Sequence, residues 1–460
     1  MKGITGWNYA PYEPPLFHAG RPYINRVVPR ENGIRIEWLN LGEEKEYEVF
    51  AAKRGEELQK VESTKESFCE ITSLEKDTDY AVQVKCGESQ SRIRLARTQV
   101  SVGTIVNYLH PDDEAYAFSG RYLCSPSMVR TPTGALLASM DLFAPDAPQN
   151  LTLIFRSEDD GETWHYISEL MPCFWGKMFF HHGKLYMLAC SQEYGDLLIG
   201  VSEDEGKTFS APVALLRGSC SCKMEGVHKN PQPVVEYKGR IWNTLEWGAW
   251  ARGYHAPMVM SALADADLMN PGNWSITEPV VYNPNWPGVA KGPSAGNIEG
   301  TLVVFPDGKL YNVMRYDMGR CQPNYGIALA YRVNDENPES KLTFAKAIPF
   351  PGNHSKFEIH RDAKTGKYYS IVSRILGPDS AQNRNLLSLV SSEDLNEWKV
   401  ETDLIDRRND DPKLVGFQYV DFFFEGDDLL YLCRTALNGA HNFHDANQQT
   451  FHRVRNFRNL

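Results

Sequence analysis

The sequence predicts an all-β protein in which a small β-sandwich precedes a six-bladed β-propeller, a ring of repeated four-stranded sheets. Three observations predict this class. Aromatic residues make up 12% of the chain, whereas long amphipathic helical patterns are scarce. One octamer recurs at residues 157–164 and 202–209. A turn glycine followed by an apolar strand returns about every 60 residues, a reasonable length for one blade. A seventh blade would fit between Gly239 and Gly308.

Composition limits the classes of partner. Of the 460 residues, 42% are hydrophobic and 23% charged, which is ample apolar material for a large core. The formal net charge of −11 disfavours nucleic acid and an anionic membrane surface as partners. No apolar run approaches the roughly 20 residues that cross a bilayer. The composition does not decide whether the protein forms a homo-oligomer.

Residues 1–21 are interpreted as an N-terminal arm. They contain prolines and aromatics but no apolar segment after a basic head, so they do not resemble a secretory signal, and we expect a cytoplasmic protein. The nine cysteines show no regular framework, and Cys220 and Cys222 are too close together for a zinc knuckle. We therefore expect reduced thiols, no metal and no cofactor.

Residues 22–98 carry the pattern of a small β-sandwich. The run I-R-I-E-W from Ile34 to Trp38 alternates, as a half-buried strand does. Leu74, Thr78 and Tyr80, followed by A-V-Q-V, resemble the tyrosine corner of fibronectin type III domains. The resemblance implies a spacer, a dimerisation module or a sugar-binding module, with no catalytic part.

The octamers S-E-D-D-G-E-T-W and S-E-D-E-G-K-T-F predict hairpin turns. Asp and Ser side chains bond back to nearby amides, Gly161 supplies a positive φ, and Trp164 closes the gap beneath the turn. A degenerate third copy keeps Ser392, Asp394 and Trp398 but lacks the glycine. The octamer resembles the Asp-box of sialidases and related β-propellers, which indicates a fold and not an activity.

Within residues 99–460 each turn glycine is followed, seven or eight positions later, by a residue at the end of an apolar strand. These residues are Asp141, Cys190, Glu246, Arg315, Arg374 and Arg434. Equivalent positions in successive blades lie at the same end of the same strand, so we expect the charged members around one axial mouth. Because arginine binds carboxylates bidentately, this set predicts an acidic sugar as ligand. The last strand, residues 450–457, is expected to pair with residues 102–109 and to close the ring.

The segment S-P-S-M-V-R-T-P-T-G-A-L-L-A-S-M-D is similar to the first blade of sialidases. The resemblance implies that Asp141, at its end, is the acid/base Asp of that family. Glu299 and Arg315 then match its Glu and its second arginine, and Arg374 its third. Tyr419, in F-Q-Y-V-D, corresponds to the nucleophilic tyrosine, which the Glu activates.

Two departures from the patterns of known families leave the activity undecided. Cys124 stands where sialidases have their first arginine, so the carboxylate clamp lacks one member. A second propeller branch acts as lyases and glycosidases on rhamnosyl-glucuronate ends of plant gums, and residues 350–360 and 433–447 are similar to it. That branch uses a catalytic histidine where this chain has Met140, and methionine cannot transfer a proton.

Further residues are candidates because of their type and position. His255 is an alternative to Asp141 for moving the proton, since it follows Glu246 where the strands turn over the mouth. The substrate-binding candidates supply charge, hydrogen bonds or aromatic surface. They are Lys177, His228, Glu246, Tyr254, Arg315, His354, Lys356, Arg374, Gln418 and Arg434.

Three hypotheses follow for the function. The first is an exo-acting glycosidase or lyase that acts on an acidic, uronate-containing oligosaccharide. The second is a sialidase with an altered carboxylate clamp. The third is a non-catalytic glycan-binding propeller, which gains support because the sialidase arginine and the gum-enzyme histidine are both absent. Whether the chain is an enzyme, and whether cleavage would add water or eliminate, stays open.

Overall fold

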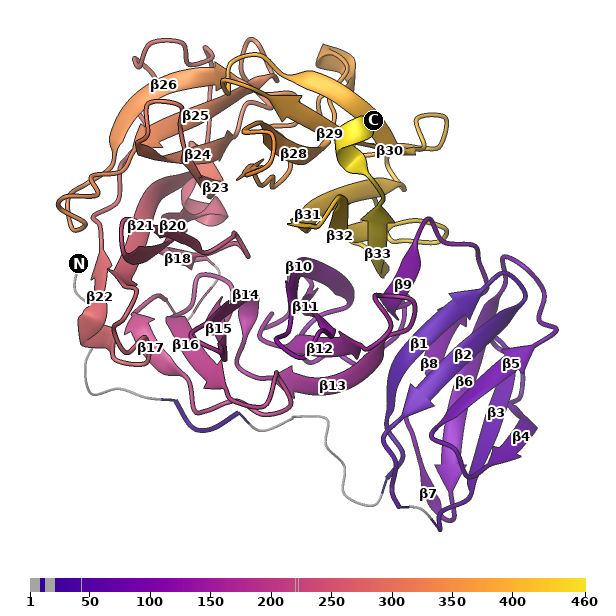
Figure 1. Ribbon diagram of the computed structural model, residues 1–460. Helices are drawn as coiled ribbons and strands as arrows, with labels where there is room; N and C mark the ends of the chain where they lie inside the picture. Colours follow the sequence, from indigo (N-terminus) through magenta and orange to yellow (C-terminus); the bar gives the residue numbers. More distant parts are fainter. Residues whose placement is uncertain (1–8, 13–20, 43, 220, 222) are drawn as a thin grey trace.

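The computed structural model describes residues 9–12, 21–42, 44–219, 221 and 223–460 and consists mainly of β-strands and loops, which confirms the all-β prediction. The N-terminal arm is described only at residues 9–12 and 21, and Cys220 and Cys222 lie outside the described residues. Figure 1 shows a ring of sheets with a separate sandwich beside it. Within the described ranges, no helix is long and apolar enough to cross a membrane.

The sandwich consists of two antiparallel sheets, with strand orders β1-β2-β5 and β4-β3-β6-β7, and with β8 beside β6. The tyrosine corner expected at Tyr80 is present, because the backbone N–H of Glu75 donates a hydrogen bond to Tyr80 Oη over 3.0 Å. The strands are β1 (Ile24–Arg30), β2 (Gly33–Trp38), β3 (Tyr47–Lys53), β4 (Gln59–Thr64), β5 (Phe68–Thr72), β6 (Asp79–Cys86), β7 (Ser89–Gln90) and β8 (Arg94–Arg97).

Six further sheets surround a common axis in the described part of the chain, and we number them blades 1 to 6 (Figure 1). Blade 1 is β10 (Tyr122–Arg130), β11 (Leu136–Phe143), β12 (Thr152–Ser157) and β13 (His165–Leu170). Blade 2 is β14 (Phe174–His181), β15 (Lys184–Cys190), β16 (Leu197–Ser202) and β17 (Val213–Leu216). Blade 3 is β18 (Gly226–His228), β20 (Arg240–Ala249), β21 (Tyr254–Leu263) and β22 (Trp274–Ile276), with β19 (Val235–Tyr237) beside β20.

The remaining three sheets follow the same order from the axis outward. Blade 4 is β23 (Asn297–Val304), β24 (Leu310–Tyr316), β25 (Ile327–Arg332) and β26 (Thr343–Pro349). Blade 5 is β27 (His360–Arg361), β28 (Tyr368–Ser373), β29 (Leu386–Ser392) and β30 (Lys399–Asp406). Blade 6 is β31 (Gly416–Glu425), β32 (Asp428–Ala436), β33 (Gln448–Val454) and β9 (Thr104–Tyr108). Short 3-10 turns are η1 (Trp250–Arg252), η2 (Pro271–Asn273), η3 (Pro378–Ser380) and η4 (Phe457–Asn459).

The two ends of the propeller meet in blade 6. Strand β33 pairs antiparallel with β9, with Gln448 opposite Tyr108 and Thr450 opposite Ile105. The closure expected from the sequence is therefore confirmed, and it removes the free edges of an open sheet. The interval from Gly239 to Gly308, which had room for a seventh blade, supplies β20, β21, β22 and β23 to blades 3 and 4.

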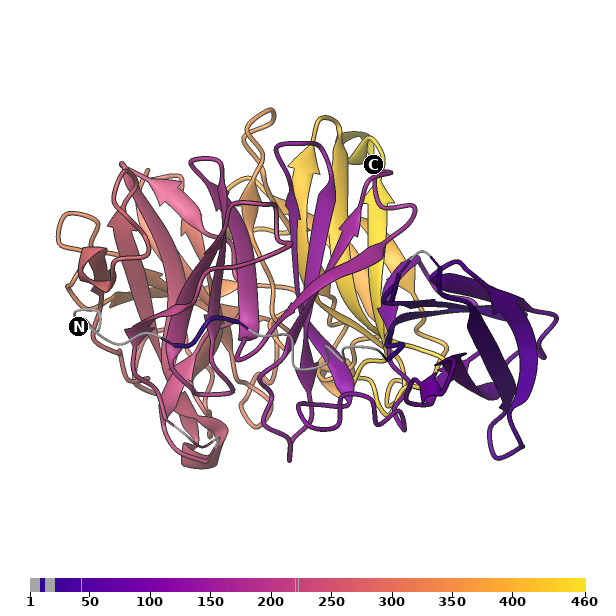
Figure 2. The same cartoon turned by 90° about the horizontal axis from the view of Figure 1, so that it is seen from below.

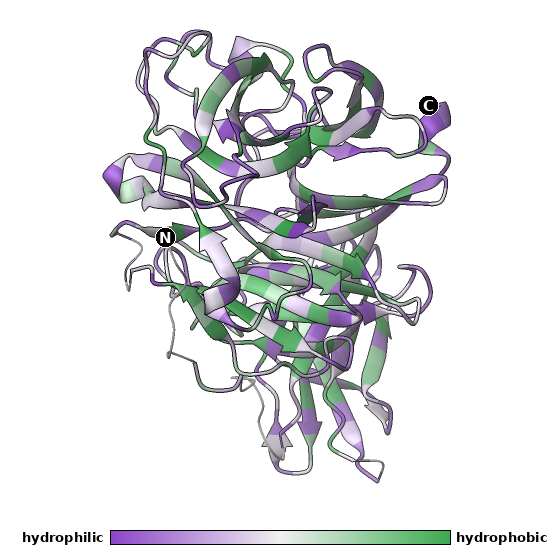
Figure 3. Cartoon of the chain, turned by 60° about the vertical axis from the view of Figure 1, so that its left-hand side comes forward, coloured by the Kyte–Doolittle hydropathy of each residue, from purple (hydrophilic) through white to green (hydrophobic). Residues whose placement is uncertain are grey.

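Apolar side chains fill the space between neighbouring blades. The cluster between blades 2 and 3, for example, joins Leu188 and Ile199 to Leu245 and Met258, all fully buried. In Figure 3 hydrophobic residues lie along the strands and hydrophilic residues gather in the loops. Figure 2 shows the blades from the side, with the sandwich at the edge of the ring. This packing fixes the inner strands, which carry the candidate site.

The two octamers form the predicted hairpin turns. Ser157 Oγ donates to Asp159 Oδ1 over 2.8 Å and accepts from the N–H of Gly161. Asp159 also accepts from the N–H and the hydroxyl of Thr163, and the Trp164 ring is fully buried beneath the turn. Equivalent bonds connect the members of the second octamer.

We expect Asp159→Ala to lower the free energy of unfolding by about 1–2 kcal/mol, because three hydrogen bonds of the turn are lost. Denaturant unfolding measures this change. The neighbouring Glu158 is 68% exposed and pairs with Arg156, so Glu158→Ala is the control and should change stability by less than about 0.5 kcal/mol. Equal losses for the two variants would contradict a structural role of the octamer.

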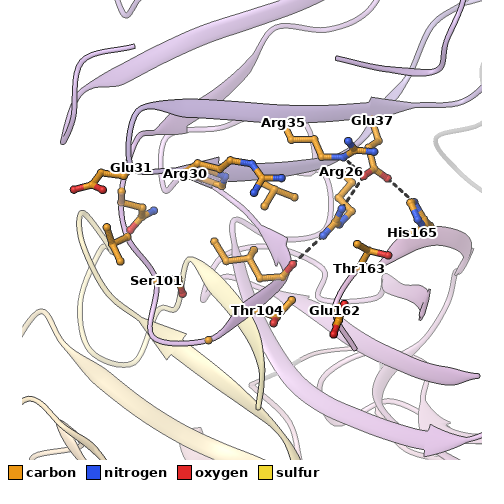
Figure 4. Close-up of a pocket in the computed structure, with 16 residues that line it drawn as sticks. Arg26, Arg30, Glu31, Arg35, Glu37, Ser101, Thr104, Glu162, Thr163 and His165 are labelled. Atoms are coloured by element: carbon orange, nitrogen blue, oxygen red, sulfur yellow. Dashed lines mark hydrogen bonds and ion pairs between the residues drawn. The ribbon is translucent and has the colours of Figure 1, made fainter. Parts of the chain in front are cut away.

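The sandwich packs on the propeller through buried charged groups. Arg94 Nε lies 2.6 Å from Asp113 Oδ2, and both side chains are almost fully buried. A hollow of about 640 Å³ lies at this boundary. Figure 4 shows Arg26 and Arg35 converging on Glu37 there, with His165 reaching Glu37 from the propeller. Burial alone would raise the pKa of Glu37, but the hydrogen bond from His165 and the charge of Arg26 hold it at about 2. These paired charges fix the two parts against each other.

Candidate active site

The inner strands of four blades share one irregularity. The pairing of β10, β14, β23 and β31 with the next strand is interrupted in each blade by a bulge of two residues. The first residue of every bulge is not glycine and yet has a positive φ, between 47° and 60°: Ser125, Trp175, Glu299 and Tyr419. Such backbone costs on the order of 1–3 kcal/mol per residue and is concentrated at functional sites. The bulges therefore mark one end of the axis as the candidate site.

The bulge in β23 also explains a glycine. A Cβ atom on Gly300 would lie 2.2 Å from Asn312 Oδ1 and 2.3 Å from Met314 Sδ, so a larger residue would require both side chains to shift. The N–H of Gly300 donates to Glu246 Oε1 over 3.2 Å. The sequence Glu299-Gly300 thus combines a functional side chain in a left-handed conformation with a residue that lets neighbouring strands approach.

Three side chains from blades 4 and 6 meet at these bulges. Tyr419 Oη donates to Glu299 Oε1 over 2.7 Å. Arg315 Nη1 lies 2.6 Å from Glu299 Oε2 and 3.2 Å from Tyr419 Oη. Glu299 and Tyr419 are 3% and 8% exposed, so the group is shielded from water. We call Glu299, Arg315, Arg384, Tyr419 and Arg434 the axial cluster.

Electrostatics separates the protonation states of Glu299 and Tyr419. Burial acts to raise the pKa of Glu299, but the Arg315 guanidinium outweighs it and the net shift is downward. Burial and the Glu299 charge raise the pKa of the Tyr419 phenol, against the opposing effect of Arg315, Arg384 and Arg434. The resting state is therefore a carboxylate that accepts from a neutral phenol, the arrangement of a general base and its nucleophile.

Two more arginines face the Tyr419 ring. The guanidinium carbons of Arg434 and Arg384 lie 5.0 Å and 6.0 Å from the ring centroid. Arg384 donates to the Gln418 side chain and to the carbonyl of His354, and Arg434 donates to the carbonyl of His444. Within the described part of the chain Nε of each arginine has no hydrogen-bond partner. Burial, together with Arg315, lowers the pKa of Arg384 to about 10, so an added anion would stabilise the cluster.

Aromatic rings line the adjoining side of the site. The Trp175 ring lies 4.1 Å from the His228 ring, and Tyr194 and Trp250 contact His255 at ring distances of 5.8 Å and 4.7 Å. Trp250 is 49% exposed, so its ring offers an open surface to a sugar face. His255 Nε2 shares a hydrogen bond with Tyr194 Oη, and burial lowers the pKa of His255 well below its usual value.

The predicted proton carrier Asp141 lies beneath the bulges. It is fully buried, and its two oxygens accept from the Thr152 hydroxyl at 2.5 Å and from the N–H of Trp175 at 2.7 Å. Burial raises the pKa of Asp141 to about 7. Asp141 stands opposite Cys124 in the strand pairing. These bonds hold the Trp175 bulge in place and leave Asp141 no exposed edge toward a substrate.

Glu193 is the carboxyl group at the rim of the site. It follows β15, is partly exposed, and accepts from Gln149 Nε2 over 3.2 Å. Burial raises its pKa, while the nearby His228 opposes this shift. His228 itself shares a 2.7 Å hydrogen bond with Glu246, so it is oriented by a second carboxylate. A carboxyl group with a raised pKa and partial exposure has the properties of a proton donor.

Some of the other predicted residues hold the axial cluster in place or lie at its rim, and others lie away from it. Gln418 and His354 hold Arg384, and Tyr254 is partly exposed at the rim. Lys177 pairs with Asp421 and Lys356 with Glu358, both with buried side chains on the far side of the bulges. The sequence had suggested that these two lysines bind an acidic substrate. In the structure they are instead paired with carboxylates of the protein.

Arg374 also departs from the prediction. Its guanidinium pairs with Asp403 on the outer strand β30 and donates to Ser388 Oγ. The third arginine at the Tyr419 ring is instead Arg384, which the sequence analysis missed. Arg384 lies in the loop before β29, so the regular offset from a turn glycine did not indicate it. Glu193 and Tyr194, in the loop after β15, were missed for the same reason, and the only available signal was the aromatic and acidic content of S-Q-E-Y. Trp175 was missed because it lies at the bulge of β14.

Within the described residues no group of three or more His, Cys, Asp or Glu side chains could hold a metal ion. His441 and His444 both contact Asp445, which makes a local hydrogen-bond network. The seven described cysteines are free.

Comparison with known proteins shows the fold. An α-L-arabinanase of Penicillium chrysogenum, solved with arabinobiose, is 15% identical, with a TM-score of 0.51, and the match covers 77% of this chain and 97% of that one. The GH93 α-L-arabinofuranosidase of Fusarium graminearum, also with arabinobiose, is 15% identical, with a TM-score of 0.51 and coverage of 77% and 98%. Neither a family model nor a curated protein matches the sequence. The predicted β-propeller fold is confirmed by these likenesses.

Proposed function

We propose that the protein is an exo-acting, retaining glycosidase that removes a terminal acidic sugar from an oligosaccharide. The observation that carries the proposal is the axial cluster, in which the Tyr419 phenol donates to Glu299 and is surrounded by three arginines. The likeness of the fold to two enzymes solved with arabinobiose supports a carbohydrate as the substrate.

The first chemical step uses Tyr419, Glu299 and Glu193. Tyr419 Oη attacks the anomeric carbon, and Glu299 takes the phenol proton through the existing 2.7 Å hydrogen bond. The glycosidic C–O bond breaks, and Glu193 donates its proton to the departing oxygen. A tyrosine suits an acidic sugar because a neutral nucleophile avoids the repulsion between a carboxylate nucleophile and the substrate carboxylate.

The second step reverses these roles. Glu193, now ionised, removes a proton from water, and the oxygen of that water attacks the anomeric carbon. The bond to Tyr419 breaks, and Glu299 returns the proton to the phenolate. Two displacements at one carbon give retention of configuration. Arg315 contacts both Glu299 and Tyr419 and stabilises negative charge on the phenolate in both steps.

The arginines select the terminal sugar. Arg384 and Arg434 donate to neutral oxygens, so each can form a stronger charge-assisted bond with a substrate carboxylate. The aromatic side, with Trp175 and Trp250, packs against the apolar face of a sugar ring. A terminal uronate fits this pair of surfaces. Sialic acid is the second candidate, because three arginines surround Tyr419 even though Cys124 replaces the first sialidase arginine.

We also propose that the sandwich is a fibronectin type III-like support. Its two strand orders and the Tyr80 corner favour this assignment. The buried Arg94–Asp113 pair favours a fixed support over a mobile spacer.

The test is a screen of the purified protein with product detection by mass. Rhamnosyl-glucuronate oligosaccharides, other uronate oligosaccharides, sialyllactose and arabinobiose are incubated separately. Release of one acidic monosaccharide with the addition of water supports the proposal, whereas a product lighter by one water indicates elimination. Cleavage of arabinobiose alone, or binding without cleavage, would contradict an acid-specific glycosidase.

We expect Glu193→Gln to lower kcat on an oligosaccharide by about 100-fold or more, because the departing oxygen no longer receives a proton. The same variant should retain most of the first-step rate on a 2,4-dinitrophenyl glycoside, whose leaving group needs no proton. Since the acid form of Glu193 is required, wild-type kcat on the oligosaccharide should fall as the pH rises through its raised pKa. Stopped-flow measurement of dinitrophenol release checks the first-step rate, and wild-type kcat on the oligosaccharide at several pH values checks the pH dependence. Equal losses on both substrates would exclude Glu193 as the proton donor.

A further inference from the structure

We infer that a groove next to the loop of Glu193 binds a neutral sugar at the leaving-group end of the substrate, an inference that rests on the proposed function. The groove has a volume of about 600 Å³, within the usual range for ligand pockets. Its lining includes Tyr9, Asn150, Gln192, Asp196, Arg217 and Glu225. These residues come from the N-terminal arm, from the loop before β12 and from the loops around blade 2.

The groove is continuous along the chain with the proposed proton donor. Asn150 follows Gln149 and Gln192 precedes Glu193, and Gln149 Nε2 donates to Glu193 Oε2 over 3.2 Å. The same two loops therefore present one pair of side chains to the site and the adjacent pair to the groove. A proton donor contacts the oxygen of the bond that breaks, so the leaving group begins at Glu193. The groove lies where the next sugar would follow.

The chemistry of the groove suits a neutral sugar. Asp196 accepts from Tyr9 Oη and from the N–H of Gly218, each over 2.8 Å, and Arg217 Nε lies 3.7 Å from Asp196. Two carboxylates and one guanidinium line the groove, so it lacks the cationic excess that the axial cluster has. Asn150 also lines the groove, and its side-chain amide supplies the donor and acceptor types that bond to sugar hydroxyls.

Tyr9, in the described segment 9–12, lines one side of the groove. The N–H of Tyr9 donates to the carbonyl of Pro212 over 3.1 Å, and the Tyr12 ring contacts the Phe209 ring edge-on. These contacts hold residues 9–12 against blade 2. Burial and the Asp196 hydrogen bond raise the pKa of Tyr9 to about 12, so it stays a neutral phenol. A neutral aromatic ring beside polar side chains is a common surface for sugar binding.

The experiment compares two substrates with the same acidic terminal sugar. One carries 4-nitrophenol as the leaving group, and the other carries two neutral sugar units. Asn150→Ala and Tyr9→Ala should each lower kcat/KM on the trisaccharide by about tenfold, because a hydrogen bond or a stacking surface is lost. The nitrophenyl glycoside ends before the groove, so its kcat/KM should change by less than roughly twofold. The exposed Asn334 in blade 4 provides the control variant Asn334→Ala.

The outcomes separate this inference from the proposed function. If Asn150→Ala and Tyr9→Ala affect the two substrates equally, or do not affect the trisaccharide, the groove does not bind the leaving-group sugar. If neither substrate is cleaved, the proposed function fails, and the groove is tested directly by saturation-transfer NMR with arabinotriose, galactotriose and xylotriose. Contact with one of these sugars that Asn150→Ala weakens would support the groove. Absence of contact with all three would overturn it.

Discussion

Tyr419→Phe is expected to lower kcat on the acidic oligosaccharide by a factor of about 10³ or more, while the Kd for the substrate stays within roughly threefold of the wild type. The phenyl ring keeps its contacts with Arg384 and Arg434, but the attacking oxygen and its 2.7 Å hydrogen bond to Glu299 are gone. Single-turnover kinetics and calorimetric titration measure the two quantities separately.

Tyr368→Phe is the matched control for this variant. Tyr368 is also buried and donates one hydrogen bond, to the carbonyl of Val304, but it lies in blade 5 away from the axial cluster. It should therefore lower stability by about 1 kcal/mol and leave turnover unchanged. Near-normal turnover of Tyr419→Phe would rule out the tyrosine nucleophile. His255→Ala would then be the next variant to measure, since His255 is the histidine alternative.

The β-propeller could be predicted from the sequence because the motifs that indicate it are short and local. A turn needs particular residues at fixed positions, as in Ser157, Asp159 and Gly161, and each turn precedes a strand of regular length. The closure of β33 on β9 follows from the general need to remove open edges. The partnership of Glu299 and Tyr419 came from a family resemblance, not from spacing, since 120 positions separate them in the chain.

The error at Arg374 has a simple physical reason. Side chains alternate between the two faces of a strand, so a shift of one residue reverses the face. In blade 5 the equivalent position is Ser373, whose hydroxyl donates to the carbonyl of Phe417 in the neighbouring blade. Arg374, one residue further on, points to Asp403. Arg434 also lies eight positions after its turn glycine and yet reaches the Tyr419 ring, so the offset from the glycine does not by itself determine the face.

Loops and bulges account for the remaining misses. Arg384 and Glu193 lie on loops whose path depends on the neighbouring blades, and no periodicity constrains them. The left-handed conformations of Trp175 and Glu299 are disfavoured locally and exist because the surrounding sheet and the Asp141 and Glu246 side chains support them. Residue preferences would have argued against these conformations, so the sequence did not indicate where the inner strands turn their side chains to the axis.

Arg384→Ala is expected to weaken binding of the acidic substrate by about 2–4 kcal/mol, because a buried charge-assisted contact to the carboxylate is lost. Arg374→Ala should leave binding unchanged and cost about 1 kcal/mol of stability, because its partner Asp403 is partly exposed. Calorimetric titration of both proteins in the Tyr419→Phe background keeps the substrate intact during the measurement.

A neutral analogue makes the assignment specific to charge. When the substrate carboxylate is reduced to a primary alcohol, Arg384→Ala should change the affinity by less than about 1 kcal/mol, since only a neutral hydrogen bond remains to be lost. Arg384 is a buried cation beside Arg315 and Arg434, which lowers its pKa to about 10. Its removal relieves that repulsion, so the unfolding free energy should fall by no more than about 1 kcal/mol. An equal loss of affinity for the acid and the alcohol would show that Arg384 shapes the site without binding the carboxylate, and the acidic specificity would then have to be abandoned.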